Sequence, residues 1–278
     1  MLALIDMIAE MLSFTFMVRA VVVGLLVSLC AALLGVNLVL KRYAMIGTAL
    51  GNVGFAVMAI AGVIDVAPVT ISLPVVIVAA FVMLRVSEKS KVKGDSIVAL
   101  VSTSGIAVGV IFTGLTTGIT LHICNVMFGS IFAMTQRDMY ISIGLSVAVV
   151  GLFVLFYKQL FAVTHDENFA KATGMKVEIY KSMLAILTAV TIVVGMRMMG
   201  ALLIAALTVF PALSAMQLCK KFRSVVIASA TIGVTCFFVG MLFSFGLDLP
   251  PGACVVGVNL AVYVIFSCIA FVKRRGFA

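Results

Sequence analysis

The stretch HDENFAKATG, residues 165–174, lies in a polar segment between two long apolar runs. This segment, residues 158–181, carries acidic and basic side chains, whereas most of the chain is apolar. Hydrophobic residues make up 64% of the sequence and charged residues 10%, with a mean hydropathy of +1.32. Soluble domains have about 25% charged residues. The sequence therefore predicts an all-α polytopic membrane protein in which residues 158–181 form a loop between two spans.

Apolar runs long enough to cross a bilayer recur along the whole chain. A transmembrane helix needs about 20 apolar residues for a hydrocarbon core of about 30 Å. Because residues 182–218 form either one broken unit or two tight helices, we expect eight or nine transmembrane helices in a single domain, residues 1–278. The predicted spans are 14–40, 45–64, 67–85, 95–115, 139–157, 182–199, 200–218, 224–245 and 252–272.

Two shorter segments are expected to lie at the membrane without crossing it. Residues 123–134 are apolar but too short to span, since a helix rises about 1.5 Å per residue, and are predicted to be re-entrant or half-inserted. Residues 1–12 lack the basic start and the cleavage site of a signal peptide. They carry Asp6 and Glu10 on one face, which favours an interfacial helix.

The basic residues predict the orientation of the chain. Sixteen of its 19 Lys and Arg residues fall in loops on one side of the predicted topology. Because positive charge in short loops is retained in the cytoplasm, we expect the N-terminus outside and the C-terminus inside. The net charge of +9 is then a topology signal, with membrane lipid as the partner and no nucleic acid. The 158–181 loop is cytoplasmic on this prediction.

A short helix is predicted within this loop. Thr164 and Glu167 have the spacing of a capping box, and Gly174 stands where a left-handed C-terminal cap would need it. A helix of about ten residues is marginal in water, so we expect it to pack against its own membrane domain or a partner. The residues expected to make that contact are Phe169, Ala170 and Thr173.

This helix carries the first of five resemblances to known permeases. Its form is similar to D-x-E-x-A-x-x-x-G, which Asp166, Ala170 and Gly174 match, while Asn168 stands at the usual glutamate. The pattern belongs to permeases of the zinc- and manganese-type ABC transporter family. Segments that resemble other blocks of that family follow in the same order, at residues 33–50, 127–139, 200–216 and 246–256.

The resemblance implies a non-catalytic permease subunit of an importer for divalent transition metal ions, zinc or manganese, in the bacterial cytoplasmic membrane. It implies a homodimer on two ATPase subunits, fed by an extracellular metal-binding lipoprotein. ATP and Mg would bind to the ATPase, with no cofactor on this chain, which has no P-loop motif. The short helix would be the coupling helix seated on the ATPase. Its implied contact residues are Asp166, Glu167, Phe169, Ala170 and Gly174.

The chain departs from the family at the second predicted span. Members that carry zinc or manganese generally have D-A-L-S-H where this chain has residues 48–52, so the aspartate is Thr48 and the histidine is Asn52. Positions four apart share a helix face, but a hydroxyl and an amide are poor zinc ligands. Thr48 and Asn52, with Asp248 near the outer surface, are nevertheless the candidate residues of the pathway.

Other possible ligands have simpler explanations. His122, with Cys124 and Asn125 close to it, fits a solvated loop histidine. The methionines at 196, 198 and 199 could suit a soft ion, but methionine is also a common core gap filler. Six cysteines without paired spacing predict no disulfide.

Three alternative functions follow from the same features. An ABC permease for a chelated metal or a non-metal solute would also tolerate weak ligands. An ion-coupled secondary transporter would normally need buried carboxylates near the midplane, which the predicted spans lack. A membrane enzyme would need clustered acid, base or nucleophile groups, and the two histidines, His122 and His165, are predicted on opposite sides of the membrane.

Overall fold

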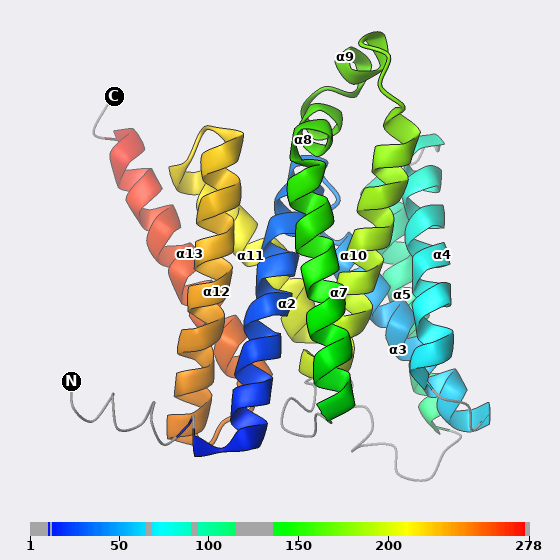
Figure 1. The fold of residues 1–278 in the computed structure, drawn as a ribbon, viewed down its shortest axis with the longest axis vertical. Helices are drawn as coiled ribbons and strands as arrows, with labels where there is room; N and C mark the ends of the chain where they lie inside the picture. Colours follow the sequence, from blue (N-terminus) through cyan, green and yellow to red (C-terminus); the bar gives the residue numbers. More distant parts are fainter. Residues whose placement is uncertain (1–10, 12, 65–67, 90–93, 115–135, 276–278) are drawn as a thin grey trace.

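Eleven helices make up the described part of the chain (Figure 1). The computed structural model describes residue 11 and residues 13–64, 68–89, 94–114 and 136–275. The predicted helix over residues 1–12, apart from residue 11, and the predictions for residues 123–134, His122, Cys124 and Asn125 lie outside these residues. The helices are α2 (Thr15–Leu40), α3 (Ile46–Ile64), α4 (Pro68–Lys89), α5 (Gly94–Gly114), α7 (Gln136–Leu155), α8 (Tyr157–His165), α9 (Glu167–Ala172), α10 (Val177–Met199), α11 (Ala201–Leu218), α12 (Phe222–Leu247) and α13 (Pro251–Arg275).

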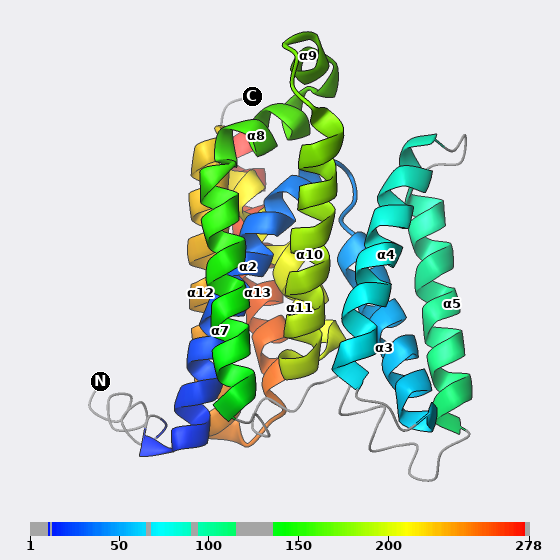
Figure 2. The same cartoon turned by 45° about the vertical axis from the view of Figure 1, so that its right-hand side comes forward.

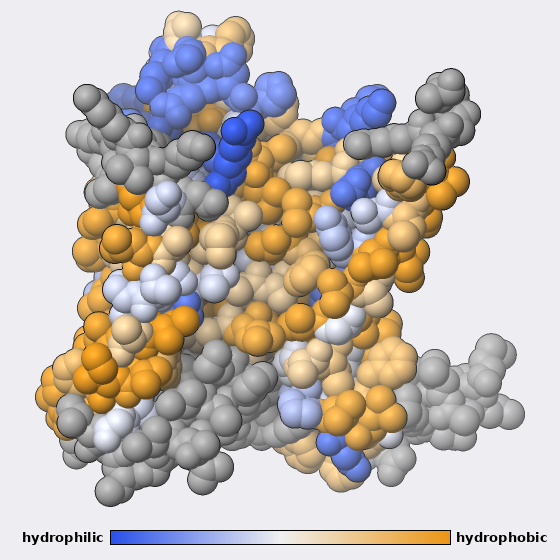
Figure 3. All heavy atoms as spheres, turned by 180° about the vertical axis from the view of Figure 1, so that it is seen from behind, coloured by the Kyte–Doolittle hydropathy of each residue, from blue (hydrophilic) through white to orange (hydrophobic). Residues whose placement is uncertain are grey.

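The long helices run between two opposite ends of the molecule. Figures 1 and 2 place α8, α9 and the end of α13 at one end, and the start of α2 at the other. The face in Figure 3 is largely hydrophobic in its middle part, and hydrophilic side chains gather at the end that carries α9. This arrangement is that of a protein embedded in a bilayer with α9 outside the hydrocarbon.

The described helices agree with the lower of the two predicted numbers of spans, which is eight. Seven described helices are long and apolar enough to cross a membrane, and there are eight if the bent pair α7 and α8 forms one span. The fold is therefore the predicted all-α polytopic architecture. Helix α4, whose described apolar part is Pro74–Met83, packs beside α3 and α10.

Helix α2 forms the centre of the bundle, in contact with α7, α10, α11 and α12. Two glycines allow close packing there. A Cβ at Gly24 would lie 2.0 Å from the Phe237 ring of α12, and one at Gly35 would lie 1.9 Å from the Thr208 carbonyl oxygen of α11. Small residues let transmembrane helices approach in this way, since packing rather than the hydrophobic effect drives their association in lipid.

The chain bends sharply after α7, and this corrects the predicted span 139–157 and the predicted loop 158–181. The axes of α7 and α8 differ by 69°. Aromatic rings support the bend: Tyr157 and Phe161 of α8 lie 5.6 Å and 4.7 Å from Phe222 at the start of α12, between ring centroids. The predicted loop is thus mostly helical, because α8 fills its first part and α10 begins at Val177 rather than at 182.

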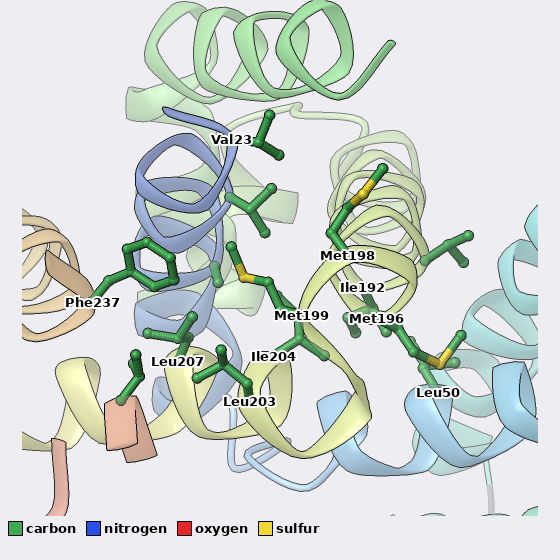
Figure 4. Close-up of a cluster of buried hydrophobic side chains, with 14 of the residues drawn as sticks. Val23, Leu50, Ile192, Met196, Met198, Met199, Leu203, Ile204, Leu207 and Phe237 are labelled. Carbon is green, nitrogen blue, oxygen red and sulfur yellow. The ribbon is translucent and has the colours of Figure 1, made fainter. Parts of the chain in front are cut away.

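The break between α10 and α11 occurs at Gly200, which has φ 87° and ψ 159°. This confirms two tight helices over residues 182–218. The nearby methionines belong to the hydrophobic core: Met196, Met198 and Met199 are at most 6% exposed. In Figure 4 their side chains point in different directions, and Met196 lies towards Leu50. They act as gap fillers rather than as a thioether cluster.

Candidate functional site

The first candidate site is α9, whose N-terminus differs from the prediction. Asp166, not Thr164, is the N-cap: its Oδ1 accepts a hydrogen bond from the Phe169 backbone N–H at 3.0 Å. The capping box was therefore wrong, because Thr164 lies within α8 and donates its hydroxyl hydrogen bond to Asn37 Oδ1 of α2 at 3.0 Å. As a result α9 has six residues instead of about ten.

The C-terminus of α9 is closed as the sequence predicted. Gly174 has φ 81°, in the left-handed region. The Gly174 N–H donates to the Lys171 carbonyl at 3.0 Å, and the Met175 N–H donates to the Ala170 carbonyl at 3.1 Å. These two bonds form a Schellman motif, which satisfies the last carbonyl groups of a short helix.

Glu167 ties α9 to the membrane domain. One oxygen, Oε1, lies 2.6 Å from Lys171 Nζ and 2.7 Å from Lys181 Nζ, and Lys181 of α10 is only 8% exposed. Burial would raise the pKa of the Glu167 carboxyl group, but hydrogen bonds and charge from the two lysines outweigh burial and hold the pKa below its ordinary value of 4.5. Glu167 thus faces an internal partner, which sequence reasoning missed because Lys181 lies 14 positions further on.

Of the three residues expected to pack, only Ala170 is buried. It forms a small core with Val163 of α8 and Val177 of α10. Phe169 is 63% exposed and Thr173 is also exposed, so neither packs on the membrane domain, and their contact with a partner stays a prediction. Phe169 therefore lies on the exposed side of α9, opposite the side that packs on α8 and α10 through Ala170.

The second candidate site is a cavity of about 520 Å³ beside α3. It brings Thr48 and Asn52 together, one helical turn apart. Most of the lining is apolar and comes from α3, α5, α11 and α13. The lining residues are Ala44, Met45, Thr48, Asn52, Ile106, Ala201, Leu202, Ala205, Ala206, Val209, Phe210 and Val256.

Asn52 makes a polar contact that the sequence did not predict. Its Nδ2 donates to Ser102 Oγ of α5 at 2.7 Å. Helix α5 comes this close because residue 105 is glycine: a Cβ there would lie 2.9 Å from the Asn52 carbonyl carbon. Local patterns could not reveal this pairing, since the two residues are 50 positions apart.

Asp248 is not among the residues that line the cavity. It is the C-cap of α12, exposed, with φ 52°. Within the described residues there is also no group of three or more His, Cys, Asp or Glu side chains that could hold a metal ion. The cavity therefore offers a hydroxyl and an amide in an apolar surrounding, and no charged ligand among its lining residues.

The described helices form the hydrophobic bundle of a polytopic membrane protein, with an anchored helix outside it and a cavity beside α3. Comparison with known proteins identifies it further. The ABC 3 transport family matches residues 13–270, and the chain belongs to this family. It is therefore a multi-pass membrane permease, and the family decides against an ion-coupled secondary transporter.

Three similar proteins span nearly the whole chain. The manganese import system permease protein ScaB of Streptococcus gordonii is 24% identical over 266 residues, which cover 94% of this chain and 95% of ScaB. A probable iron transport system membrane protein of Haemophilus influenzae is 28% identical over 277 residues, covering 97% and 98%. The structure of PsaBC from Streptococcus pneumoniae in complex with Fab matches with a TM-score of 0.83, 25% identity and coverage of 96% and 95%.

Proposed function

We propose that this chain is the translocation subunit of an ATP-driven importer for divalent transition metal ions, with manganese or zinc as cargo. The observation that carries the proposal is α9, which is capped at both ends, anchored by Glu167 and exposes Phe169. Family membership and the names of the manganese and iron transport relatives support the cargo class. The bacterial cytoplasmic membrane is its proposed location.

In this proposal α9 is the coupling helix, and a separate ATPase subunit provides its groove. The ATPase binds ATP and Mg, and this chain binds neither. An exposed aromatic side chain on a rigid helix is the kind of anchor that dominates protein interfaces. Phe169 is that anchor, with Asp166 and Gly174 shaping the helix ends and Ala170 packing behind. Glu167 contributes through Lys181 rather than by direct contact.

Closure of the ATPase dimer would move the bundle through two connections from the α8 and α9 region. One is the ion pair between Glu167 and Lys181, which leads into α10. The other is the hydrogen bond from Thr164 to Asn37, which leads into the central helix α2. Asn37 is fully buried, so breaking this bond would leave a buried polar group without its partner. Both connections favour rigid transmission of the movement.

A homodimer is proposed from the position of the cavity. Among the seven described helices that are long and apolar enough to span a membrane, α13 and α5 are the least buried inside the chain. Only 17% of the apolar stretch of α13 and 22% of that of α5 is buried, and both helices contribute residues to the cavity lining. A second copy facing this side would enclose the cavity between two subunits. Thr48 and Asn52 of each copy would then face one pathway, and Asp248 would lie near its outer mouth.

The proposed orientation has the N-terminus outside and the C-terminus inside, with α9 in the cytoplasm where the ATPase is found. An extracellular lipoprotein would deliver the cargo to the opposite end. The basic loops support this orientation through the retention of positive charge in the cytoplasm.

A second candidate cargo is a chelated metal. The uncharged lining and the volume of about 520 Å³ favour it, since a chelate brings its own ligands and needs space rather than charge. The two cargo classes differ in what they require for uptake: free Mn(II) alone supports it in the first case, and only the chelated form supports it in the second.

The function is tested by purifying the tagged chain from native membranes, identifying its partners by mass spectrometry, and reconstituting the complex in liposomes. We expect an ATPase subunit to co-purify and ATP-dependent uptake of Mn(II) or Zn(II) in the presence of the lipoprotein. Absence of an ATPase from a well-folded preparation would overturn the proposal. An ATPase with uptake of a chelate only would select the second cargo class.

A further inference from the structure

A groove with a volume of about 650 Å³ lies between α7 and α10, at the end of the bundle that carries α9. The two helices run side by side in Figures 1 and 2. Helix α7 contributes Leu152 to the lining, and α10 contributes Glu178, Ile179, Ser182, Met183, Ile186 and Leu187. This α7–α10 groove shares no residue with the cavity beside α3.

The α7–α10 groove changes from polar to apolar along α10. Glu178 lies in the first turn of α10, and Ser182 follows one turn later and donates its hydroxyl to the Glu178 carbonyl at 2.8 Å. The other lining side chains of α10 are apolar, and Leu187 lies about 13 Å beyond Glu178 along the helix axis. The groove thus has a carboxylate at one end and an apolar channel behind it.

The carboxylate end of the groove lies at the membrane surface. Phe156, directly after α7, and Tyr180, in the first part of α10, have ring centroids 6.0 Å apart beside Glu178. Tyrosine is enriched at the level of the lipid headgroups, and hydrophilic side chains gather at this end of the molecule in Figure 3. From this surface the groove follows α10, a candidate membrane span, into the hydrocarbon.

The surroundings of the groove at this depth are lipid. Leu152, Ile179 and Ile186 are exposed side chains of the lining, whereas Leu187 is buried at its base. The second copy proposed above would cover α5 and α13, and neither helix lines the groove. A molecule that fits it has a polar head at the membrane surface and an apolar chain in the hydrocarbon, as a phospholipid has.

We propose that the α7–α10 groove binds a phospholipid whose headgroup carries a primary ammonium, of the phosphatidylethanolamine type. One acyl chain lies along Met183 and Leu187, and the ammonium donates to the Glu178 carboxylate. A carboxylate has about four acceptor positions, so the interaction that Glu178 already has does not prevent this contact. An anionic headgroup would instead bring a second negative charge to Glu178, which repels it. This lipid site requires only the membrane bundle and is independent of the cargo and of the ATPase.

The chain contains no tryptophan, so one introduced tryptophan is a unique fluorophore. Ile179→Trp places it in the groove. Val154→Trp is the reference: Val154 is 65% exposed on α7 and is not a lining residue, and the contact between Phe156 and Tyr180 puts it at a similar depth. Each full-length variant is reconstituted in liposomes of equal parts phosphatidylethanolamine and phosphatidylglycerol with the same acyl chains. One lipid at a time carries bromine on its chains, which quenches tryptophan on contact.

The quenching levels give the binding of phosphatidylethanolamine relative to phosphatidylglycerol. In Val154→Trp we expect equal binding, because this position meets bulk lipid. In Ile179→Trp we expect a preference for phosphatidylethanolamine of about threefold to fivefold, the effect of one exposed charge pair. Adding Glu178→Gln should remove the preference and leave the quenching itself. Adding Asp248→Asn is the charge control and should change nothing, because Asp248 is exposed at the opposite end of α12.

A second measurement needs no tryptophan. Native mass spectrometry of the delipidated, purified chain records saturable binding of added phosphatidylethanolamine. Ser182→Phe fills the groove with a ring and should abolish this binding, whereas Val154→Phe, outside the groove, should retain it.

Three results would overturn the lipid site. Equal binding of the two lipids in Ile179→Trp, or a preference that persists in Glu178→Gln, excludes the contact between ammonium and carboxylate. A preference for phosphatidylglycerol assigns the headgroup to the basic residues of this end instead. Saturable binding that persists in Ser182→Phe places the lipid elsewhere on the chain. Loss of the metal importer function in the uptake assay leaves all these expectations unchanged, so the two proposals fail separately.

Discussion

The helix α9 and the cavity beside α3 are built from opposite kinds of contact. The short helix α9 is held by charge, through Glu167 and two lysines, and by backbone caps at both ends. The cavity contains neutral groups, and Asn52 is held by a serine. The first region retains most of the family pattern, while the second departs from it at Thr48 and Asn52. In the proposed function, the segment that meets the ATPase and the segment that meets the cargo are therefore separate parts of one chain, and variants of one should leave the other unchanged.

The largest effect is expected at α9, from Phe169→Ala. Removing an exposed aromatic anchor from an interface costs about 2 kcal/mol or more, which weakens binding of the ATPase about thirtyfold. ATP-dependent uptake should fall in proportion. Affinity is measured by titrating the detergent-solubilised permease with purified ATPase subunit.

Asn168→Ala is the control for this variant, since Asn168 is exposed next to Phe169 and is not an expected contact. Equal affinities of the Phe169→Ala and unaltered chains would contradict the role of α9 as the coupling helix. Binding of Mn(II) at the cavity should be the same in both, which would separate the two regions.

The next effect is expected at the cavity. Thr48→Asp combined with Asn52→His places a carboxylate and an imidazole on one helix face, and both are good zinc ligands. We expect zinc to bind at least about tenfold more tightly to the permease–ATPase complex. Zinc affinity is measured by competition with a chromogenic chelator, and ATPase affinity should not change. Unchanged zinc affinity in a folded complex would show that this face of α3 does not meet the cargo.

These two regions also show how far the sequence predicts the structure. Hydropathy predicts the spans because each apolar run is a local property of the sequence. The cap at Gly174 is also predicted locally, because glycine adopts the left-handed φ of a helix C-terminus without steric cost. The N-cap was misplaced because Thr164 and Asp166 are both capable of capping, and a distant partner, Asn37, engages Thr164. Ser102 and Lys181 were missed because helix pairing, not local pattern, brings them to Asn52 and Glu167.

A smaller effect is expected from the ion pair that anchors α9. Lys181→Met should leave Glu167 with only the exposed Lys171, so that α9 detaches more often. We expect hydrogen exchange at residues 167–175 to accelerate about fivefold. Lys171→Met is the control and should have less effect, because Lys171 is 52% exposed and water screens its charge. Equal acceleration of exchange in the two variants would contradict the prediction that Lys181 stabilises α9 more than Lys171 does.

The same ion pair predicts a pH dependence confined to α9. The folded-state pKa of Glu167 is lowered, so the pair stabilises docked α9 above the ordinary value of 4.5 and loses that contribution as the pH falls through the lower folded value. Exchange at residues 167–175, corrected for its intrinsic rate, should therefore accelerate in acid. Glu167→Gln should exchange fast at neutral pH and lose this acid dependence. Acid acceleration that persists in Glu167→Gln would assign it to another group.

The smallest effect is expected from Gly174→Ala. At φ 81° an alanine side chain is strained by about 1 kcal/mol, although no atom within 4 Å of the added Cβ would clash. The strain destabilises the Schellman motif and so lowers the fraction of molecules in which α9 is folded with Phe169 exposed. We therefore expect the affinity for the ATPase to fall about threefold to fivefold. The affinity of Gly174→Asn should lie between those of Gly174→Ala and the unaltered chain, because asparagine tolerates this conformation better than alanine.

The control is Gly151→Ala on α7, where there is also space for a Cβ but φ is helical. A loss of affinity that followed side-chain size rather than φ would show that Gly174 touches the ATPase directly, and α9 would then be recognised by its end as well as by its aromatic face.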